Sequence, residues 1–255
     1  MAANDPLHIT FDNGDFGSIG NIFNVNTSVP GQVTLGPSGS AMMEWAVGPD
    51  AGHGYGTYTV VAKLDGGTEG AGIVFWPADN SWPGQEIDLV EMMPDGSGRQ
   101  YGTLHWNAGG SDAYESRIFD GVYGGSWHEY QMVWEPGKIT MSVDGQVKTA
   151  FTDHVPADYA HGGMNNTIGA LNLKDYTSIS IADVRYDPLY AAAPAPTPAA
   201  TVSAIAADVV HDAATTTDVA NDAATTLAAA ADVIDWNALA ALATANYEAT
   251  GSWFV

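Results

Sequence analysis

The sequence predicts an all-β sandwich, and three observations carry this prediction. Up to residue 190, apolar and polar residues alternate in short runs such as residues 139–143, which is typical of strands with one buried face. The dipeptide Asp144-Gly145 follows that run and is a strong hairpin signal. The same part of the chain is rich in Gly, Trp and Tyr. Many short strands joined by glycine and asparagine turns indicate two packed antiparallel sheets.

The chain changes character near Tyr190, and we expect three parts. Residues 1–190 form the sandwich, and residues 191–200 form an Ala- and Pro-rich linker that is stiff and extended. Residues 201–255 form an acidic tail dominated by Ala, Thr and Asp. The tail has no cation, because all seven basic residues precede the linker: Lys63, Arg99, Arg117, Lys138, Lys148, Lys174 and Arg185.

Part of this tail has a helical pattern. Asp235 can cap a short helix in which Trp236, Leu239 and Leu242 share one face. An acidic tail without cations that ends in apolar residues resembles the uncleaved secretion signals of type I exported bacterial proteins, although the usual glycine-rich calcium-binding repeats are absent. A disordered linker to another module is an equal alternative.

Composition excludes several classes of partner. The formal net charge is -23, from 30 acidic and 7 basic residues, so we expect neither nucleic acid nor an anionic membrane or sulfated polysaccharide as a partner. The chain has no cysteine, and hence neither disulfides nor thiolate metal sites. It lacks both an apolar run of about 20 residues and an N-terminal secretory signal. A cleaved signal or another export route would be needed for secretion.

The most informative segment is the strand-like run of residues 86–91. It carries Glu86, Asp88 and Glu91 between apolar spacers, and alternation places Glu86 and Asp88 on one face. A β-bulge after Asp88 would turn Glu91 to the same face. Carboxylates two positions apart lie roughly 6–7 Å from each other, and side-chain rotation can reduce this to about 5–5.5 Å, the separation used in retaining glycoside hydrolysis. An ordinary solvated acidic strand face would explain neither the apolar spacers nor the flanking segments.

Residues 86–91, Glu-Ile-Asp-Leu-Val-Glu, resemble the Glu-x-Asp-x-x-Glu signature of glycoside hydrolase family 16 in its bulged, laminarinase-like branch. Flanking segments agree with the family in order and spacing. These segments are residues 55–63, 75–77, 82–83, 102–106, 127–130, 134–139 and 143–145. The resemblance covers about residues 7–187 and implies a concanavalin-like jelly roll and a bacterial β-glucanase.

The resemblance also implies roles for single residues. Glu86 would be the nucleophile and Glu91 the general acid and later the general base. Asp88 would lie between them and separate their pKa values. His105 falls where the family's next strand brings a polar side chain beside the acid; a satisfied polar group is the alternative for this histidine.

Aromatic residues flank the acidic run and could stack on the apolar faces of sugars. We expect this of Trp76, Trp82 and Trp106, with core packing as the alternative for each. The family often has Gly where this chain has Gln85, and the shorter connection could displace Trp82. By contrast, Trp127 and Trp134 lie in alternating patterns and are assigned to the core.

The family often binds a structural calcium ion opposite the cleft. Asp183 matches the family's ligand on the last strand, and residues 12–15 offer further oxygen ligands. An Asx turn explains residues 12–15 equally well. We expect no cofactor for catalysis itself.

The leading functional hypothesis is a secreted, monomeric, retaining endo-glycosidase that cleaves internal β-1,3 or β-1,3-1,4 bonds of a polysaccharide. A second hypothesis keeps the machinery but changes the substrate to a bacterial exopolysaccharide or an agarose-type galactan. A third is a non-catalytic, lectin-like sandwich, because fold alone does not separate binding from catalysis. A lectin, however, needs no proton donor paired with a nucleophile.

Overall fold

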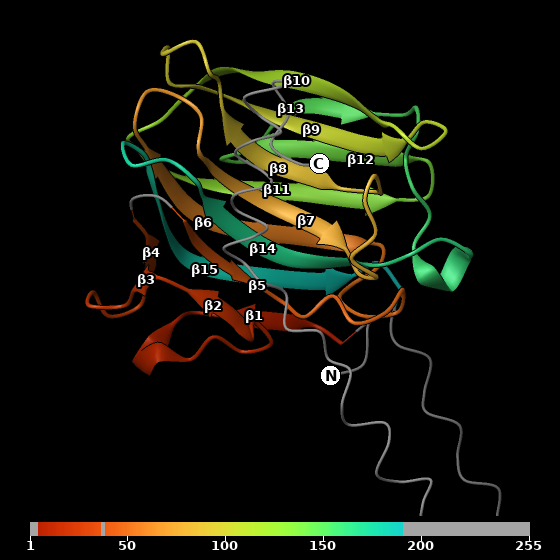
Figure 1. Cartoon of the computed structure of the whole chain (residues 1–255), viewed down its shortest axis with the longest axis horizontal. Coiled ribbons are helices and arrows are strands. Elements are labelled where there is room, and N and C mark those ends of the chain that lie inside the picture. The colour runs from red at the N-terminus through yellow and green to blue at the C-terminus, as the bar shows by residue number, and fades with distance from the viewer. Residues whose placement is uncertain (1–4, 37–38, 191–255) are drawn as a thin grey trace, which may run out of the picture.

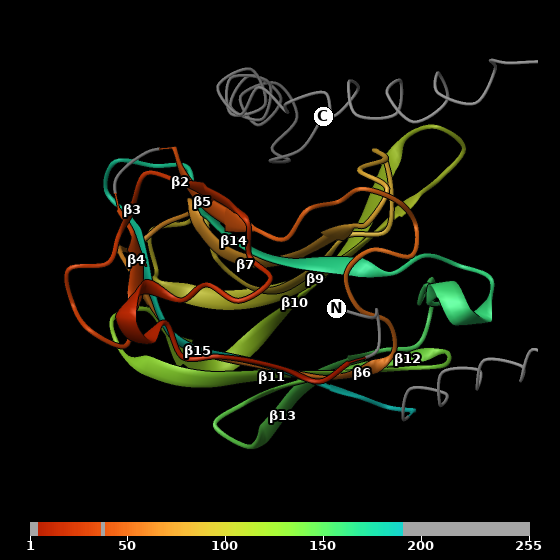
Figure 2. The same ribbon diagram turned by 90° about the horizontal axis from the view of Figure 1, so that it is seen from below.

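Two antiparallel sheets pack face to face in the computed structural model, which describes residues 5–36 and 39–190 (Figure 1). The predicted linker, the acidic tail and the helix proposed for residues 235–242 lie outside the described residues. Figure 2 shows the two sheets edge-on as two layers. The predicted all-β sandwich of the jelly-roll type is confirmed.

One layer is an eight-stranded sheet in which β15 lies at the centre. Its spatial order is β13 (Gln146–Phe151), β12 (Lys138–Val143), β11 (Trp127–Glu135), β6 (Gly56–Asp65), β15 (Ser178–Pro188), β4 (Val33–Leu35) and β3 (Val25–Asn26). The short strand β1 (Leu7–Ile9) also pairs with β15.

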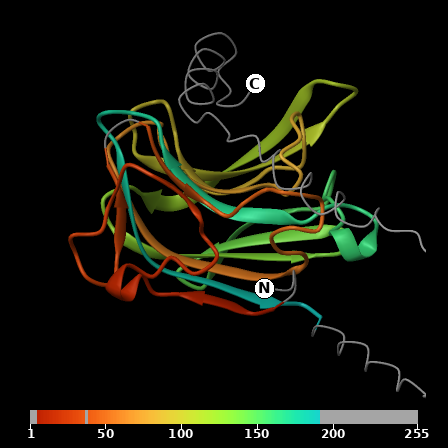
Figure 3. The same ribbon diagram turned by 60° about the horizontal axis from the view of Figure 1, so that its bottom comes forward.

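The other layer is a seven-stranded sheet that will carry the site. Its spatial order is β10 (Asp112–Tyr123), β9 (Arg99–Asn107), β8 (Ile87–Met92), β7 (Ala71–Pro77), β14 (Asn166–Asn172), β5 (Ser40–Met43) and β2 (Asn21–Phe23). The hairpin of β9 and β10 extends away from the eight-stranded layer (Figures 2 and 3). Two 3-10 turns, Asp12–Gly14 and Tyr159–His161, complete the described elements.

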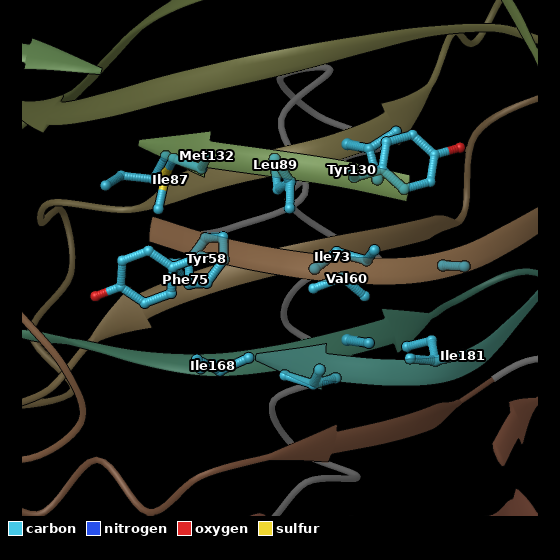
Figure 4. Packing of buried hydrophobic residues seen from close by; sticks show 14 of the residues in the cluster. Tyr58, Val60, Ile73, Phe75, Ile87, Leu89, Tyr130, Met132, Ile168 and Ile181 are labelled. Atoms are coloured by element: carbon cyan, nitrogen blue, oxygen red, sulfur yellow. The ribbon is translucent and has the colours of Figure 1, made fainter. Parts of the chain in front are cut away.

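The hydrophobic core fills the space between the sheets. Alternate residues of β6, β7, β8 and β11 point into it, as Figure 4 shows for Tyr58, Phe75, Ile87 and Leu89. Each of these four side chains is fully buried, and each contributes about 1.5–3 kcal/mol by leaving water. Because these residues face the core, their strand neighbours face the opposite side of the sheet.

The structure tests two predictions about tryptophans. Trp134 is fully buried in the core, as predicted. The core assignment of Trp127 is wrong, because its side chain is 42% exposed. Trp127 lies three positions before Tyr130 in β11, so alternation turns its side chain to the outer face of the sheet and not into the core.

Turn chemistry behaves as expected. The run 139–143 lies in β12, and Asp144 and Gly145 take positive φ angles of 50° and 73° before β13. Positive φ at both central residues is what a tight hairpin of this type requires. Among the described residues, no helix is long and apolar enough to cross a membrane.

Candidate active site

The acidic run forms β8 and the position just before it, and a bulge is present where the sequence predicts one. On the β7 side, Ile73 pairs with Val90 and Val74 pairs with Asp88, so Leu89 is the extra residue. On the β9 side, the register shifts between Asp88 and Glu91 in the same way. The bulge therefore turns Glu91 to the face that Asp88 occupies.

Cross-strand partners share a face, and here they form three rows across the seven-stranded sheet, each with one acid. The row of Glu91 runs from β2 to β10 through Phe23, Ala41, Leu171, Gly72, Glu91, Tyr101 and Ile118. The row of Asp88 runs through Asn21, Met43, Gly169, Val74, Asp88, Thr103 and Ser116. The row of Glu86 contains Thr167, Trp76, Glu86, His105 and Tyr114. We call this side of the sheet the acidic face.

His105 lies between two aspartates. Its Nε2 is 3.2 Å from Oδ2 of Asp88, and its Nδ1 is 3.0 Å and 3.2 Å from the two carboxylate oxygens of Asp112. Burial alone would lower the pKa of His105, but the hydrogen bonds with Asp112 and Asp88 outweigh it and raise the pKa to about 11. The imidazole is therefore a cation at neutral pH and donates from both nitrogens.

The three acids differ in their surroundings. Glu86 is fully buried, and neither of its carboxylate oxygens has a hydrogen-bond partner among the described residues. Burial, followed by the charge of Asp88, raises the pKa of Glu86 well above its usual value. The same two causes raise the pKa of Glu91 to about 8. Thr103 Oγ1 donates to Glu91 Oε2 over 3.3 Å. A group of this kind can hold a proton at neutral pH.

One potential ligand atom from each of Glu86, Asp88 and His105 lies within 4.8 Å of the other two. This spacing is compatible with a metal ion, but a protonated imidazole has no free lone pair for a cation. A metal ion bound here would have to displace the proton that His105 shares with Asp88 and Asp112.

Two of the predicted stacking residues lie beside the acids. The rings of Trp76 and Trp82 stack with centroids 5.4 Å apart and an angle of 15°, and Trp82 lies 5.6 Å from the His105 ring. Trp76 is 6% exposed, so Trp82 is the more accessible platform. Gln85, which stands where the family often has Gly, donates to Asn166 Oδ1 over 2.7 Å and anchors the start of the acidic run.

Trp106 does not join this group, and its predicted place beside the acids is corrected. It follows His105 directly in β9, so its side chain points to the opposite face of the sheet. There its ring stacks on His154 with centroids 4.0 Å apart. Side chains of neighbouring strand residues point to opposite faces of a sheet. The adjacency of His105 and Trp106 in the sequence therefore already indicated that only one of them could face the site.

Four residues of the site were missed by sequence reasoning: Tyr101, Thr103, Asp112 and Tyr114. All four lie on β9 or β10 beside the acids. Tyr114 pairs with His105 across the strands, and their rings are 5.5 Å apart. The Gly109-Gly110 dipeptide signals the hairpin that brings Asp112 back to His105.

Asp183 does not fit the expected calcium site. Its Oδ2 lies 2.8 Å from His8 Nε2, and its Oδ1 lies 2.6 Å from Nε of Arg185. A calcium ion needs several oxygen ligands and avoids a neighbouring cation. Asp183 belongs to no group of three or more metal-ligating side chains among the described residues.

Comparison with known proteins agrees with this geometry. A family model described as glycosyl hydrolases family 16 matches residues 49–178, just over half of the chain. The chain belongs to this family. The matched region runs from before β6 to the start of β15 and contains the acidic run and His105.

Two curated relatives match parts of this family 16 chain. A beta-glucanase of Bacillus amyloliquefaciens is 26% identical over 153 residues, which are 58% of this chain and 63% of the relative. Crh-like protein 2 of Aspergillus fumigatus is 35% identical over 99 residues, which are 37% of this chain and 21% of the relative. The match thus spans less than two thirds of the length of either relative.

Solved structures share the fold of this family 16 chain at low identity. The laminarinase catalytic domain of Thermotoga maritima has a TM-score of 0.52 and 17% identity, with 72% of this chain and 98% of that one covered. The apo Crh5 transglycosylase has a TM-score of 0.52 and 16% identity, with 74% and 86% covered. These likenesses support the jelly-roll architecture.

Proposed function

We propose that this protein is a retaining endo-glycosidase that hydrolyses internal β-1,3 or β-1,3-1,4 bonds of a glucan. The observation that carries the proposal is the alignment of Glu86, Asp88 and Glu91 in three adjacent rows of one sheet face. The beta-glucanase relative supports the substrate class. A lectin would gain nothing from burying carboxylates, because burial of unpaired acids costs stability.

In the first step Glu86 attacks the anomeric carbon and forms a covalent glycosyl-enzyme. Its oxygens have no hydrogen-bond partner among the described residues, so no donor competes for the attacking electron pair. Burial raises the pKa of Glu86, whereas the nearby His105 cation lowers it and favours the ionised form. His105 therefore helps to keep the nucleophile charged in a buried place.

Glu91 protonates the leaving oxygen in the same step. Burial and the charge of Asp88 raise its pKa to about 8, so it holds its proton at neutral pH. After the leaving group departs, the Glu91 carboxylate accepts a proton from water, and the resulting hydroxide displaces Glu86 from the sugar. Asp88, in the middle row, accepts a hydrogen bond from His105, and its negative charge raises the pKa of both glutamates.

A transglycosylase is the second candidate. Both Crh-like protein 2 and the Crh5 transglycosylase are similar to this chain. The two activities share the first step and differ in whether water or a sugar hydroxyl accepts the glycosyl group. Product analysis with and without an added oligosaccharide acceptor separates them.

The direct test is release of reducing sugar from laminarin, lichenan, agarose and bacterial exopolysaccharides. Release from laminarin or lichenan with shortening of the polymer is expected. Turnover of agarose or exopolysaccharide alone would move the substrate class to galactans or exopolysaccharides, and binding without turnover would favour the lectin hypothesis.

Variants of Glu86 test the nucleophile. Glu86→Gln should abolish turnover with the fold intact, and azide should restore part of the activity of Glu86→Ala on an activated aryl glycoside, with inverted product. Turnover by Glu86→Gln at the wild-type level would exclude this role.

Glu91 is tested with two leaving groups. Glu91→Ala should be nearly inactive on polysaccharide but less impaired on an aryl glycoside whose leaving group needs little protonation. Equal losses on both substrates would show that Glu91 is not the acid.

A further inference from the structure

The carboxylate of Asp112 meets the His105 ring at the nitrogen that Asp88 leaves free. Its two oxygens lie 3.0 Å and 3.2 Å from Nδ1 of His105, while Oδ2 of Asp88 lies 3.2 Å from Nε2. The three side chains are 16% exposed or less. The ring therefore has a carboxylate at each nitrogen in a place that excludes most water.

The β9–β10 hairpin holds Asp112 in this position. Asp112 is the first residue of β10 and pairs with Asn107. It lies two positions before Tyr114, the cross-strand partner of His105, so its side chain takes the same acidic face. Asn107 Nδ2 donates to Pro83 O over 3.0 Å. The hairpin is thus tied to the segment just before the acidic run.

Other contacts fix the His105 ring between its two aspartates. The backbone N of His105 donates to Glu86 O over 2.9 Å. The rings of Trp82 and Tyr114 lie 5.6 Å and 5.5 Å from the imidazole. The titratable groups that share the acidic face with this ring are Glu86, Asp88 and Glu91 of the acidic run, Tyr101 of β9, and Asp112 and Tyr114 of β10.

The second aspartate decides which form of the ring fits. A neutral imidazole has one N–H donor and one acceptor nitrogen, whereas a carboxylate only accepts. With Asp88 alone, a neutral ring could donate from Nε2 and leave Nδ1 unprotonated. With Asp112 at Nδ1, a neutral ring would turn a lone pair toward one carboxylate. Burial lowers the pKa of His105, and the hydrogen bond with Asp112 makes the largest contribution that raises it.

We propose that Asp112 is a positioning residue that holds His105 as a doubly protonated cation beside the nucleophile Glu86. The proposal rests on the proposed glycosidase function and deepens it. Burial and the charge of Asp88 raise the pKa of Glu86, whereas the His105 cation lowers it. The charge of Asp112 itself raises the pKa of Glu86. Any help that Asp112 gives to the ionised nucleophile therefore passes through His105.

Nitrogen-15 NMR of histidine-labelled protein tests the proposal directly, because it reports the protons on each ring nitrogen. The chain has seven histidines, and the spectrum of His105→Gln identifies the His105 signals by their loss. Wild-type His105 should keep both ring protons from about pH 5 to about pH 9. In Asp112→Asn the amide oxygen can still accept from Nδ1 but carries no charge, so His105 should lose one proton within this range. Asp112→Glu should keep both.

Kinetics test whether the cation serves the reaction. Asp112→Asn should turn over polysaccharide at the wild-type kcat at pH 5 and about tenfold more slowly at pH 8, with KM unchanged at both. In a His105→Gln background, Asp112→Asn should cause no further loss. Asp120→Asn is the matched control and should match the wild type, because Asp120 is an exposed aspartate of the same strand.

Three results would overturn the proposal. They are loss of a ring proton by wild-type His105 within the stated range, retention of both by Asp112→Asn, and an equal loss of kcat from Asp112→Asn with and without His105. The last would show that Asp112 acts on the substrate itself. The NMR measurement needs no substrate, so a wild type that releases no sugar would refute the glycosidase function, while the spectra still decide whether Asp112 holds the cation.

Discussion

Glu86, Asp88 and Glu91 carry the same functional group, and their neighbours make them different. Glu86 is buried without a hydrogen bond from the described residues. Asp88 faces the His105 cation, and Glu91 accepts from Thr103. A group of acids with unequal surroundings can hold one proton on a defined member, which is what acid and nucleophile roles require.

Asp88→Asn should move the alkaline limb of the pH profile of kcat/KM to lower pH. Burial makes the largest contribution to the raised pKa of Glu91, and the negative charge of Asp88 makes the next. The substitution removes that charge, so the pKa of Glu91 falls from about 8 and the acid loses its proton earlier. Profiles of wild type and Asp88→Asn measure the shift.

Asp95→Asn is the control for this profile, because Asp95 is an exposed aspartate beyond β8 that pairs with Arg99. It should leave both limbs in place. A limb that stays or moves to higher pH in Asp88→Asn would contradict the assignment of the alkaline limb to Glu91.

Glu86→Gln should stabilise the protein at neutral pH while it abolishes turnover. Burial and then Asp88 raise the pKa of Glu86 in the folded state. The stability that its carboxyl contributes is therefore complete below the unfolded pKa and is lost as pH rises through the folded pKa. A neutral amide avoids this loss, which we expect to be about 1–3 kcal/mol. Thermal unfolding at pH 4 and pH 8 should show a gain only at the higher pH; a gain equal at both values would assign the effect to packing.

At the scale of elements, the bulge in β8 serves both sides of the sheet. Leu89 and Val90 are both fully buried in the core, while Asp88 and Glu91 face the opposite side. A regular strand would place only one residue of this pair in the core. Gly102 lies opposite the bulge on β9, and a Cβ there would lie 3.2 Å from Asp88 O.

Gly102→Ala should therefore lower both stability and activity. The added methyl would lie 2.5 Å from Met141 Sδ and 3.0 Å from Phe119, and overpacking of this kind costs about 1–3 kcal/mol. The bulge would shift, and Asp88 and Glu91 would move with it. Chemical denaturation and kcat measure the two effects.

Gly36→Ala is the matched control for Gly102→Ala, because a Cβ at Gly36 has no atom within 4 Å. We expect it to unfold and turn over substrate almost as the wild type does. Wild-type kcat in a destabilised Gly102→Ala would show that the bulge tolerates this pressure without moving the acids.

At the scale of the whole molecule, two sheets close one core, and the acidic face lies outside it on the seven-stranded sheet. The last described strand, β15, runs through the centre of the eight-stranded sheet and pairs with β6, β4 and β1. Among the described residues, the last strand of the sandwich ends at Pro188.

Removal of residues 191–255 should leave thermal unfolding and activity almost unchanged. We propose that the Pro-rich linker separates the tail from the sandwich and that the tail directs secretion by a type I route. Calorimetry, kinetics and an export assay in a host with a matching exporter measure the three effects. A large fall in Tm would show that Trp236, Leu239 or Trp253 packs on the sandwich, and unchanged export would leave the tail as a linker.

The sequence by itself determined the sandwich class, the hairpin at Asp144-Gly145, and the acidic strand with its bulge. Each of these depends on neighbours in the chain, because side-chain alternation and turn conformation are local properties. The same alternation places the neighbouring side chains of His105 and Trp106 on opposite sides of β9.

The tertiary structure alone decided which strands lie side by side, and with that the rest of the site. Asp112 reaches His105 through the β9–β10 hairpin. The order of strands in a sheet follows from how the whole chain buries its apolar faces, and no local pattern encodes it.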